Sequence, residues 1–175
     1  MEAELLTETI TVWTPSTKRI TFDDYLDLLT EESKGDLIDG VLYMQSPPAD
    51  VHEQIFGFLF PLLQTYVVRK KLGIVRGSRT AIKFSGYNGT QPDIVFISHA
   101  RRHLIHPYFV DGAPEMVVEI LSPSTRHLDR GPKMELYAEH GVLEYWQFDP
   151  ENQTAKFFSN SCKKVKSGRD KVSLK

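Results

Sequence analysis

Two short apolar runs that each carry a carboxylate constrain this chain more than any other feature. Asp93 opens the run from Ile94 to Ile97, and Glu119 lies inside the run from Met116 to Leu121. Both runs are rich in β-branched residues and are bounded by proline or serine, a pattern typical of strands buried on both faces. An ionised carboxylate in such surroundings is costly unless it is paired or binds a cation. Glu119 therefore needs a partner, either a divalent metal ion shared with Asp93 or the ammonium group of Lys133.

The composition is that of one globular domain. The chain has 175 residues, of which 41% are hydrophobic and 25% charged, so it can bury a sizeable core. Its one cysteine, Cys162, excludes an internal disulfide and a cysteine-based zinc cluster, and we expect a cytoplasmic location. No apolar run approaches the roughly 20 residues of a membrane-spanning helix, so we expect no membrane partner. We predict a loose arm over 1–20, a single domain over 21–160 and a basic tail over 161–175.

Local signals predict an α/β domain with a mixed central sheet flanked by helices. Thr21 and Asp24 predict a capping box at a first helix, and Asp39-Gly40 between apolar pairs predicts a tight hairpin. Asp50 and Glu53 predict a second capping box, at the start of the longest helix. A further helix is expected over 132–140, and short strands are expected near 10–13, 74–76, 80–84, 143–148 and 154–158.

The segment from Ser98 to Gly112 is polar and has no apolar period. It predicts a flexible, irregular loop. Arg101 and Arg102 within it are candidate contacts for nucleic-acid phosphates.

The two carboxylates predict metal chemistry. Asp93 and Glu119 on adjacent strands can place oxygens on one Mg²⁺ or Mn²⁺, which prefer hard oxygen ligands. Such an ion activates water and neutralises charge on a phosphoryl oxygen. Lys133 falls in the first turn of a predicted helix, where the helix dipole disfavours a cation unless an acidic group compensates it. The alternative is a Glu119–Lys133 ion pair that only holds this helix on the sheet, and the residues alone leave both interpretations open.

A series of motifs, in order over about residues 20–150, carries a family resemblance. They are Asp36-Leu37-Ile38-Asp39-Gly40, Ser46-Pro47-Pro48 with His52, Gln91-Pro92-Asp93, Val117 to Ser124, Asp129 with Lys133 and Tyr137, and Gly141 to Pro150. The run resembles the PD-(D/E)xK nuclease superfamily, with its restriction-endonuclease-like core. More closely, it resembles the Uma-type endonuclease family expanded in cyanobacteria.

The resemblance implies roles for individual residues. Asp93 and Glu119 match the metal-binding carboxylates, aided by the carbonyl of Ile120. The superfamily's lysine position is Leu121 here, and Lys133 matches members in which the lysine has moved to the next helix, where it orients or deprotonates water. Accessory positions implied in the same way are Asp36, which stands where the family has Glu, with His52, Gln91, Asp129 and Tyr137. A histidine in the first turn of a helix, such as His52, is at least as often a packing or capping residue.

These observations lead to an expected function with an alternative. We expect a Mg²⁺- or Mn²⁺-dependent endonuclease that hydrolyses phosphodiester bonds in DNA, acting as a two-fold homodimer because one such site cuts one strand. The alternative is a non-catalytic nucleic-acid-binding or regulatory module that keeps the nuclease fold. Metal-dependent nicking distinguishes the first, and salt-sensitive DNA binding without nicking distinguishes the second.

Overall fold

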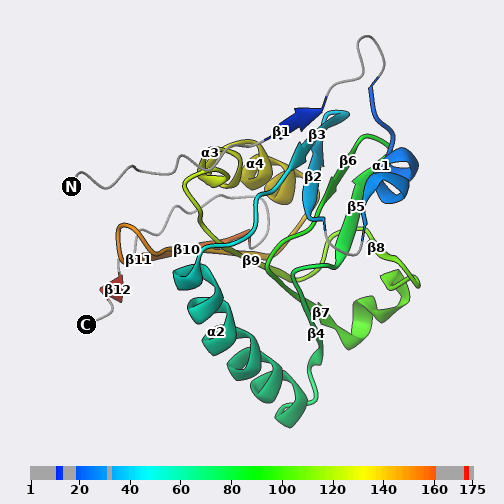
Figure 1. Cartoon of the computed structure of the whole chain (residues 1–175). Helices are drawn as coiled ribbons and strands as arrows, with labels where there is room; N and C mark the ends of the chain where they lie inside the picture. Colours follow the sequence, from blue (N-terminus) through cyan, green and yellow to red (C-terminus); the bar gives the residue numbers. More distant parts are fainter. Residues whose placement is uncertain (1–10, 14–18, 31–32, 161–171, 174–175) are drawn as a thin grey trace, which may run out of the picture.

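The computed structural model describes residues 11–13, 19–30, 33–160 and 172–173, which form two sheets with helices packed against them (Figure 1). The first sheet contains β1 (Thr11–Trp13), β2 (Gly35–Ile38), β3 (Val41–Met44), β5 (Ala81–Ser85), β6 (Asn88–Thr90) and β8 (Phe109–Asp111). The second contains β4 (Gly73–Gly77), β7 (Ile94–Ser98), β9 (Met116–Ile120), β10 (Glu144–Asp149), β11 (Thr154–Ser159) and β12 (Val172–Ser173). The helices are α1 (Phe22–Leu28), α2 (Asp50–Arg69), α3 (Arg126–Arg130), α4 (Pro132–Glu139) and the 3₁₀ helix η1 (His99–Leu104).

Both sheets are mixed, which confirms the predicted α/β class. The first has the strand order β1-β3-β2-β6-β5-β8 and the second β12-β11-β10-β9-β7-β4. Only β5 with β8 and β9 with β10 pair in parallel. Beside the expected central sheet the structure has another mixed sheet, in which the hairpin of β2 and β3 joins β6 and β5.

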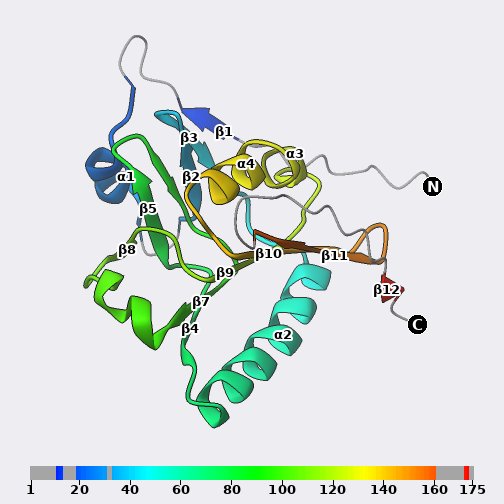
Figure 2. The same cartoon turned by 180° about the vertical axis from the view of Figure 1, so that it is seen from behind.

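The second sheet is the central layer of the molecule. Figures 1 and 2 show α2 on one of its sides and α3 and α4 on the other. Val118 packs in the same apolar cluster as Leu59 of α2, whereas Val117 packs with Tyr137 of α4. Because side chains alternate along a strand, Glu119 lies on the same face as Val117, toward α4. The candidate carboxylate therefore points into the space between the sheet and the two short helices.

Two local predictions are confirmed at the entrance to the first sheet. Thr21 and Asp24 form the capping box of α1, with the Thr21 N–H donating to Asp24 Oδ2 at 3.0 Å and the Asp24 N–H donating to Thr21 Oγ1 at 3.2 Å. Asp39 and Gly40 turn between β2 and β3 with φ of 51° and 78°. Positive φ at both central residues is what the tight hairpin turn requires, and Gly adopts it without a steric penalty.

Two other local predictions are wrong. The N-cap of α2 is Ala49, without a side-chain cap, because Asp50 is already helical and accepts a hydrogen bond from Gln54 at 2.5 Å. The segment 98–112 is not irregular, since it forms η1 and β8, and β8 gains backbone partners in β5. Such long-range pairing leaves no local pattern in the sequence. The strand expected near 10–13 is β1, while the rest of the predicted arm and tail, apart from 19–20 and β12, lies outside the described residues.

No helix in the described ranges is both long and apolar enough to cross a bilayer.

Candidate active site

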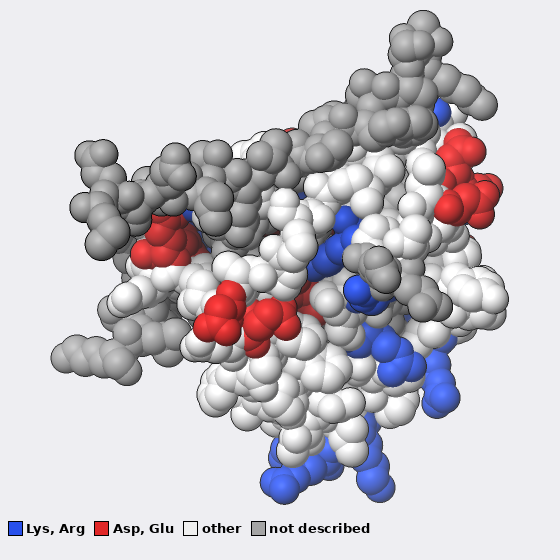
Figure 3. Space-filling view, in the orientation of Figure 1, with Lys and Arg blue, Asp and Glu red and all other residues white. Residues whose placement is uncertain are grey.

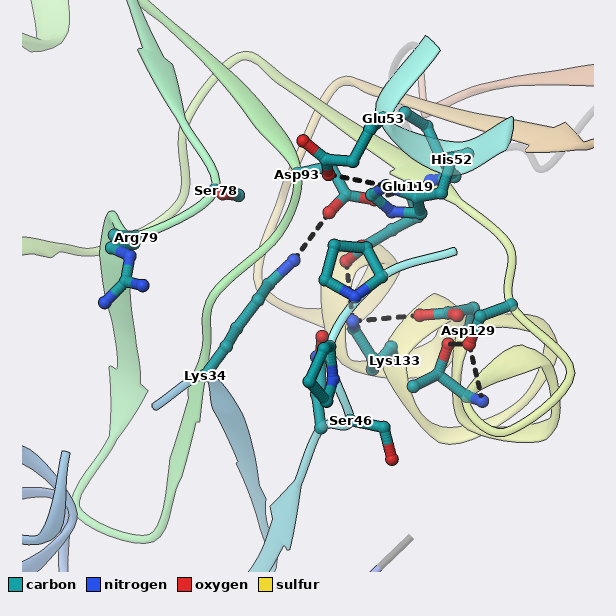
Figure 4. A pocket seen from close by; sticks show the side chains of 16 residues that line it. Lys34, Ser46, His52, Glu53, Ser78, Arg79, Asp93, Glu119, Asp129 and Lys133 are labelled. Atoms are coloured by element: carbon teal, nitrogen blue, oxygen red, sulfur yellow. Dashed lines mark hydrogen bonds and ion pairs between the residues drawn. The ribbon is translucent and has the colours of Figure 1, made fainter. Parts of the chain in front are cut away.

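The antiparallel register of β7 and β9 sets Asp93 opposite Glu119. Ile94 pairs with Val118, so the residue before Ile94 and the residue after Val118 are next in register. Both carboxylates line one cavity of about 430 Å³ beside the second sheet (Figure 4). Their exposed fractions are 2% for Asp93 and 3% for Glu119, which confirms that the chain buries both acids.

Three groups hold Asp93. Oδ1 lies 2.5 Å from Nζ of Lys34, and Oδ2 accepts the Ile120 N–H at 2.7 Å and lies 3.2 Å from Nε2 of His52. Burial opposes ionisation, but Lys34 and His52 outweigh it and hold the pKa of Asp93 well below its usual range. Asp93 is therefore an anion at neutral pH, and it ties the end of β9 and the start of α2 to β7.

Lys133 lies at the centre of three carboxylates. Its Nζ is 3.0 Å from Oδ2 of Asp36, 2.7 Å from Oε1 of Glu119 and 2.9 Å from Oδ1 of Asp129. The side chain is fully buried. Burial alone would lower its pKa, but the surrounding acids, Asp129 foremost, raise the pKa well above the usual value. From the sequence we considered only an ion pair between Lys133 and Glu119, whereas the structure gives Lys133 two further acidic partners.

Burial makes Glu119 difficult to ionise. Burial raises its pKa to about 8, against the attraction of Lys133 and with added repulsion from Asp129 and Asp93. The hydroxyl of Tyr137 donates to Oε1 at 2.7 Å, on the same oxygen that Lys133 contacts. Oε2 takes part in neither bond.

Asp36 and Gln91 fasten the first sheet to the site. Oδ1 of Asp36 accepts the Gln91 N–H at 3.0 Å, and Oδ2 accepts from Nε2 of Gln45 at 2.8 Å. Oε1 of Gln91 in turn accepts the Gly35 N–H at 3.1 Å. Asp36 is fully buried, and its two carboxylate oxygens contact these groups and Lys133. These bonds make Asp36 a structural partner of Lys133, and its predicted role as a metal ligand through water stays a prediction.

The balance of charge in the cluster bears on metal binding. Four buried carboxylates face two ammonium groups, and they belong to Asp36, Asp93, Glu119 and Asp129 on one side and to Lys34 and Lys133 on the other. With all of them ionised and His52 neutral, two negative charges lack a counter-charge. The protein can reduce that excess by taking up protons, which is the direction in which burial shifts the pKa values of Glu119 and Asp129. A divalent cation would reduce it without a proton.

The oxygen donors suit a hard divalent ion, but ammonium groups already contact them. Carboxylates and a backbone carbonyl are the ligands that Mg²⁺ and Mn²⁺ prefer. Within the described part of the chain, no three Asp, Glu, His or Cys side chains converge as a preformed metal site requires. Since Lys34 contacts one oxygen of Asp93 and Lys133 contacts one oxygen of Glu119, a metal ion would have to displace Lys34 from Asp93.

The structure brings most of the predicted residues together. Asp93, Glu119, Ile120, His52, Asp129 and Lys133 line the cavity. Asp36 and Tyr137 contact Lys133 and Glu119 from behind, and Gln91 is hydrogen-bonded to Asp36. The sequence analysis missed Lys34 and Arg79, which also line the cavity. Lys34 follows a polar stretch and directly precedes Gly35, so no local pattern marks it, and only the fold joins it to a residue 59 positions away.

Arg101 and Arg102 do not belong to this site. The Arg101 guanidinium donates to the carbonyls of Ala113 and Pro114 at 2.7 Å and 3.2 Å, and it lies 3.3 Å from Oε1 of Glu115. These bonds brace η1 against the start of β9. Arg102 is exposed, and a phosphate contact by either arginine stays a prediction.

Comparison with known proteins agrees with this fold. A solved structure described as a putative nuclease belonging to DUF820, from Anabaena variabilis ATCC 29413, is 23% identical and matches with a TM-score of 0.68 over 86% of each chain. No curated protein matches the chain. The chain therefore shares the α/β fold of that structure. Residues 22–171 match the family model Uma2, described as putative restriction endonuclease, and the chain belongs to that family.

Proposed function

We propose that this protein is a divalent-metal-dependent endonuclease that hydrolyses phosphodiester bonds in DNA. The observation that supports the proposal most is the register of β7 and β9, which sets Asp93 opposite Glu119 in a cavity that also contains Lys34 and Lys133. Membership of a family described as restriction endonucleases supports the nuclease class and DNA as the substrate.

In this proposal Asp93, Glu119 and the carbonyl of Ile120 hold Mg²⁺ or Mn²⁺. The ion, when bound, supplies an activated water and neutralises charge on the phosphoryl oxygens. Asp93 is suited to hold a cation because its lowered pKa keeps it ionised at neutral pH. Glu119 would have to release the proton that burial favours in order to hold a cation.

Lys133 acts through its positive charge. Its raised pKa keeps the ammonium protonated near neutral pH, so it is a poor candidate for the base that removes a proton from water. Its contact with Oε1 of Glu119 instead fixes that carboxylate toward the cavity. Of the two roles that the resemblance implies, orienting water or deprotonating it, the raised pKa argues against deprotonation.

Basic residues beside the cavity suit a nucleic-acid backbone. Lys34 and Arg79 line it, and Arg76 lies with Arg79 along a neighbouring hollow between β4 and β8. Figure 3 shows Lys and Arg side chains gathered across this side of the molecule. Phosphates bound there would meet Lys34 at the edge of the site, where its ammonium group would be within reach of a phosphate oxygen.

Cleavage of supercoiled plasmid tests the proposal. Wild type should convert it to nicked or linear DNA with Mg²⁺ or Mn²⁺ and stop when EDTA is added. Asp93→Asn should lose at least roughly two orders of magnitude in rate, because it removes a charged ligand. Asp27→Asn, on the exposed side of α1, is the matched control and should cut like wild type. Cleavage that survives EDTA or the Asp93→Asn change would contradict the proposal.

The second candidate is a DNA-binding module without turnover. The observation that favours it is the ion pairing of the site, since Lys34 contacts Asp93 at 2.5 Å and the described residues contain no preformed metal cluster. This candidate predicts salt-sensitive DNA binding with no nicking in either metal.

A further inference from the structure

The outer face of α2 is an exposed apolar surface. Fifteen consecutive residues, 54–68, carry no charged side chain. Large hydrophobic side chains on the helix remain open to solvent, namely Val51 (47% exposed), Phe58 (69%), Leu62 (54%), Tyr66 (56%) and Val68 (65%). Folded monomers seldom expose a contiguous apolar stripe of this kind unless it is a binding surface.

This face is distinct from the one that anchors the helix. Leu59 and Val67 are buried and pack with Val75 and Val118 on the second sheet. Phe58, Leu62 and Tyr66 recur every four residues and so form a single stripe on the outside. Packing among the described residues of one copy explains the inner face and leaves the stripe exposed.

The two ends of α2 carry opposite charges. Asp50 and Glu53 lie in the first turn, while Arg69 ends the helix and Lys70 and Lys71 follow it. Figure 3 shows the same arrangement, with acidic side chains above, basic side chains below and a white surface between them. When such a surface is rotated by 180° about an axis perpendicular to the helix, its charges are complementary to those of the unrotated copy.

We propose that the outer face of α2 is a homodimer interface in which two copies pack this helix antiparallel about a two-fold axis near its middle. Phe58 and Leu62 lie two residues either side of that point, so Phe58 of each copy meets Leu62 of the other. Asp50 and Lys70 lie ten residues either side, so the same register joins the acidic end of one copy to the basic end of the other. Antiparallel packing also aligns the helix dipoles favourably.

The size of the face sets the strength expected. A helix of 20 residues is about 30 Å long and about 10–12 Å wide, which gives a footprint on the order of 300 Å² per copy. A standard stable interface buries roughly 800 Å² per partner. The dimer should therefore be weak and should dissociate on dilution in the micromolar range.

Sedimentation velocity of the full chain tests the interface. Wild type should shift from monomer toward dimer between about 1 µM and about 100 µM. Phe58→Glu and Leu62→Glu should each weaken association at least tenfold, because each copy would bury a new carboxylate against an apolar side chain of the other. Tyr108→Glu is the matched control, since Tyr108 is 84% exposed and lies on the loop before β8. Circular dichroism checks that each variant keeps its fold.

A charge exchange tests the orientation. Asp50→Lys alone should weaken the dimer, and adding Lys70→Asp to the same chain should restore it, because each copy then presents the reversed pair. A wild type that stays monomeric at about 100 µM, or that sediments with anionic vesicles as a monomer, would overturn the proposal. So would a dimer that Phe58→Glu and Leu62→Glu leave intact.

Discussion

Lys34 and Asp93 form an ion pair of 2.5 Å at the point where a metal ion would need an oxygen ligand. The lysine is 20% exposed while the aspartate is 2% exposed, so the lysine can leave into the cavity and the aspartate cannot. In the proposed metal site this lysine would therefore compete with a cation for the same carboxylate.

Removal of that lysine should strengthen metal binding. In Lys34→Ala the carboxylate of Asp93 loses its competitor and the site loses a positive charge, so Mn²⁺ affinity should rise roughly three- to tenfold. Isothermal titration calorimetry measures the change, and Lys156→Ala, on the exposed face of β11, should leave it unaltered. A lower affinity in Lys34→Ala would show that the lysine supports the metal site.

Lys133 should be essential to the fold as well as to the chemistry. Its replacement by Met leaves three buried carboxylates without their shared cation, and breaking a buried pair typically costs roughly 3–5 kcal/mol. Urea unfolding at neutral pH should report a loss of that order, whereas Lys156→Met should change little. A Lys133→Met protein as stable as wild type would mean that the acids are already protonated.

The pH dependence of stability should identify Glu119. Its pKa is raised from an ordinary 4.5 to about 8, so between those values the folded state binds a proton that the unfolded state has released. Stability from this group is therefore present at low pH and is lost as the pH rises toward 8. Glu119→Gln should remove that loss, so that in EDTA the variant gains on wild type from pH 5 to pH 8.5 or so. An unchanged pH profile, or a loss of roughly 3–5 kcal/mol at neutral pH, would instead indicate an ionised Glu119 paired with Lys133.

DNA binding should depend on the arginines beside the cavity. Converting Arg76 and Arg79 to Ala together should weaken binding and lower the salt slope by about two, because each phosphate contact contributes about 0.9. Fluorescence anisotropy over a range of salt concentrations measures both quantities. The double variant Arg101→Ala with Arg102→Ala is the comparison. If only that variant weakens DNA binding, the DNA-binding surface lies at η1 and not beside the cavity.

The site residues that could be predicted from the sequence are those that a local pattern or a family motif identifies. Strand periodicity located Asp93 and Glu119, and the motif spacing located Lys133, so their meeting at one cavity followed once β7 and β9 paired. Asp36 was found as an acidic position, but its bonds to Gln91 and Lys133 depend on the first sheet.

Contacts distant in the chain were out of reach of the sequence. The Lys34–Asp93 pair, the division of the strands into two sheets and the parallel pairing of β8 with β5 all join segments that no local period connects. The exposure of Phe58 likewise could not be predicted from the sequence. No local pattern in the sequence determines which side of α2 the sheet covers, and the structure leaves the side with Phe58 open.

The central claim is that Asp93 and Glu119 together bind a divalent cation, and a Mn²⁺ titration by calorimetry tests it most directly. Wild type should bind the ion, and Asp93→Asn and Glu119→Gln should each weaken binding at least tenfold, about 1.4 kcal/mol, with Asp27→Asn unchanged. Equal Mn²⁺ affinity in wild type and in both variants would contradict the account.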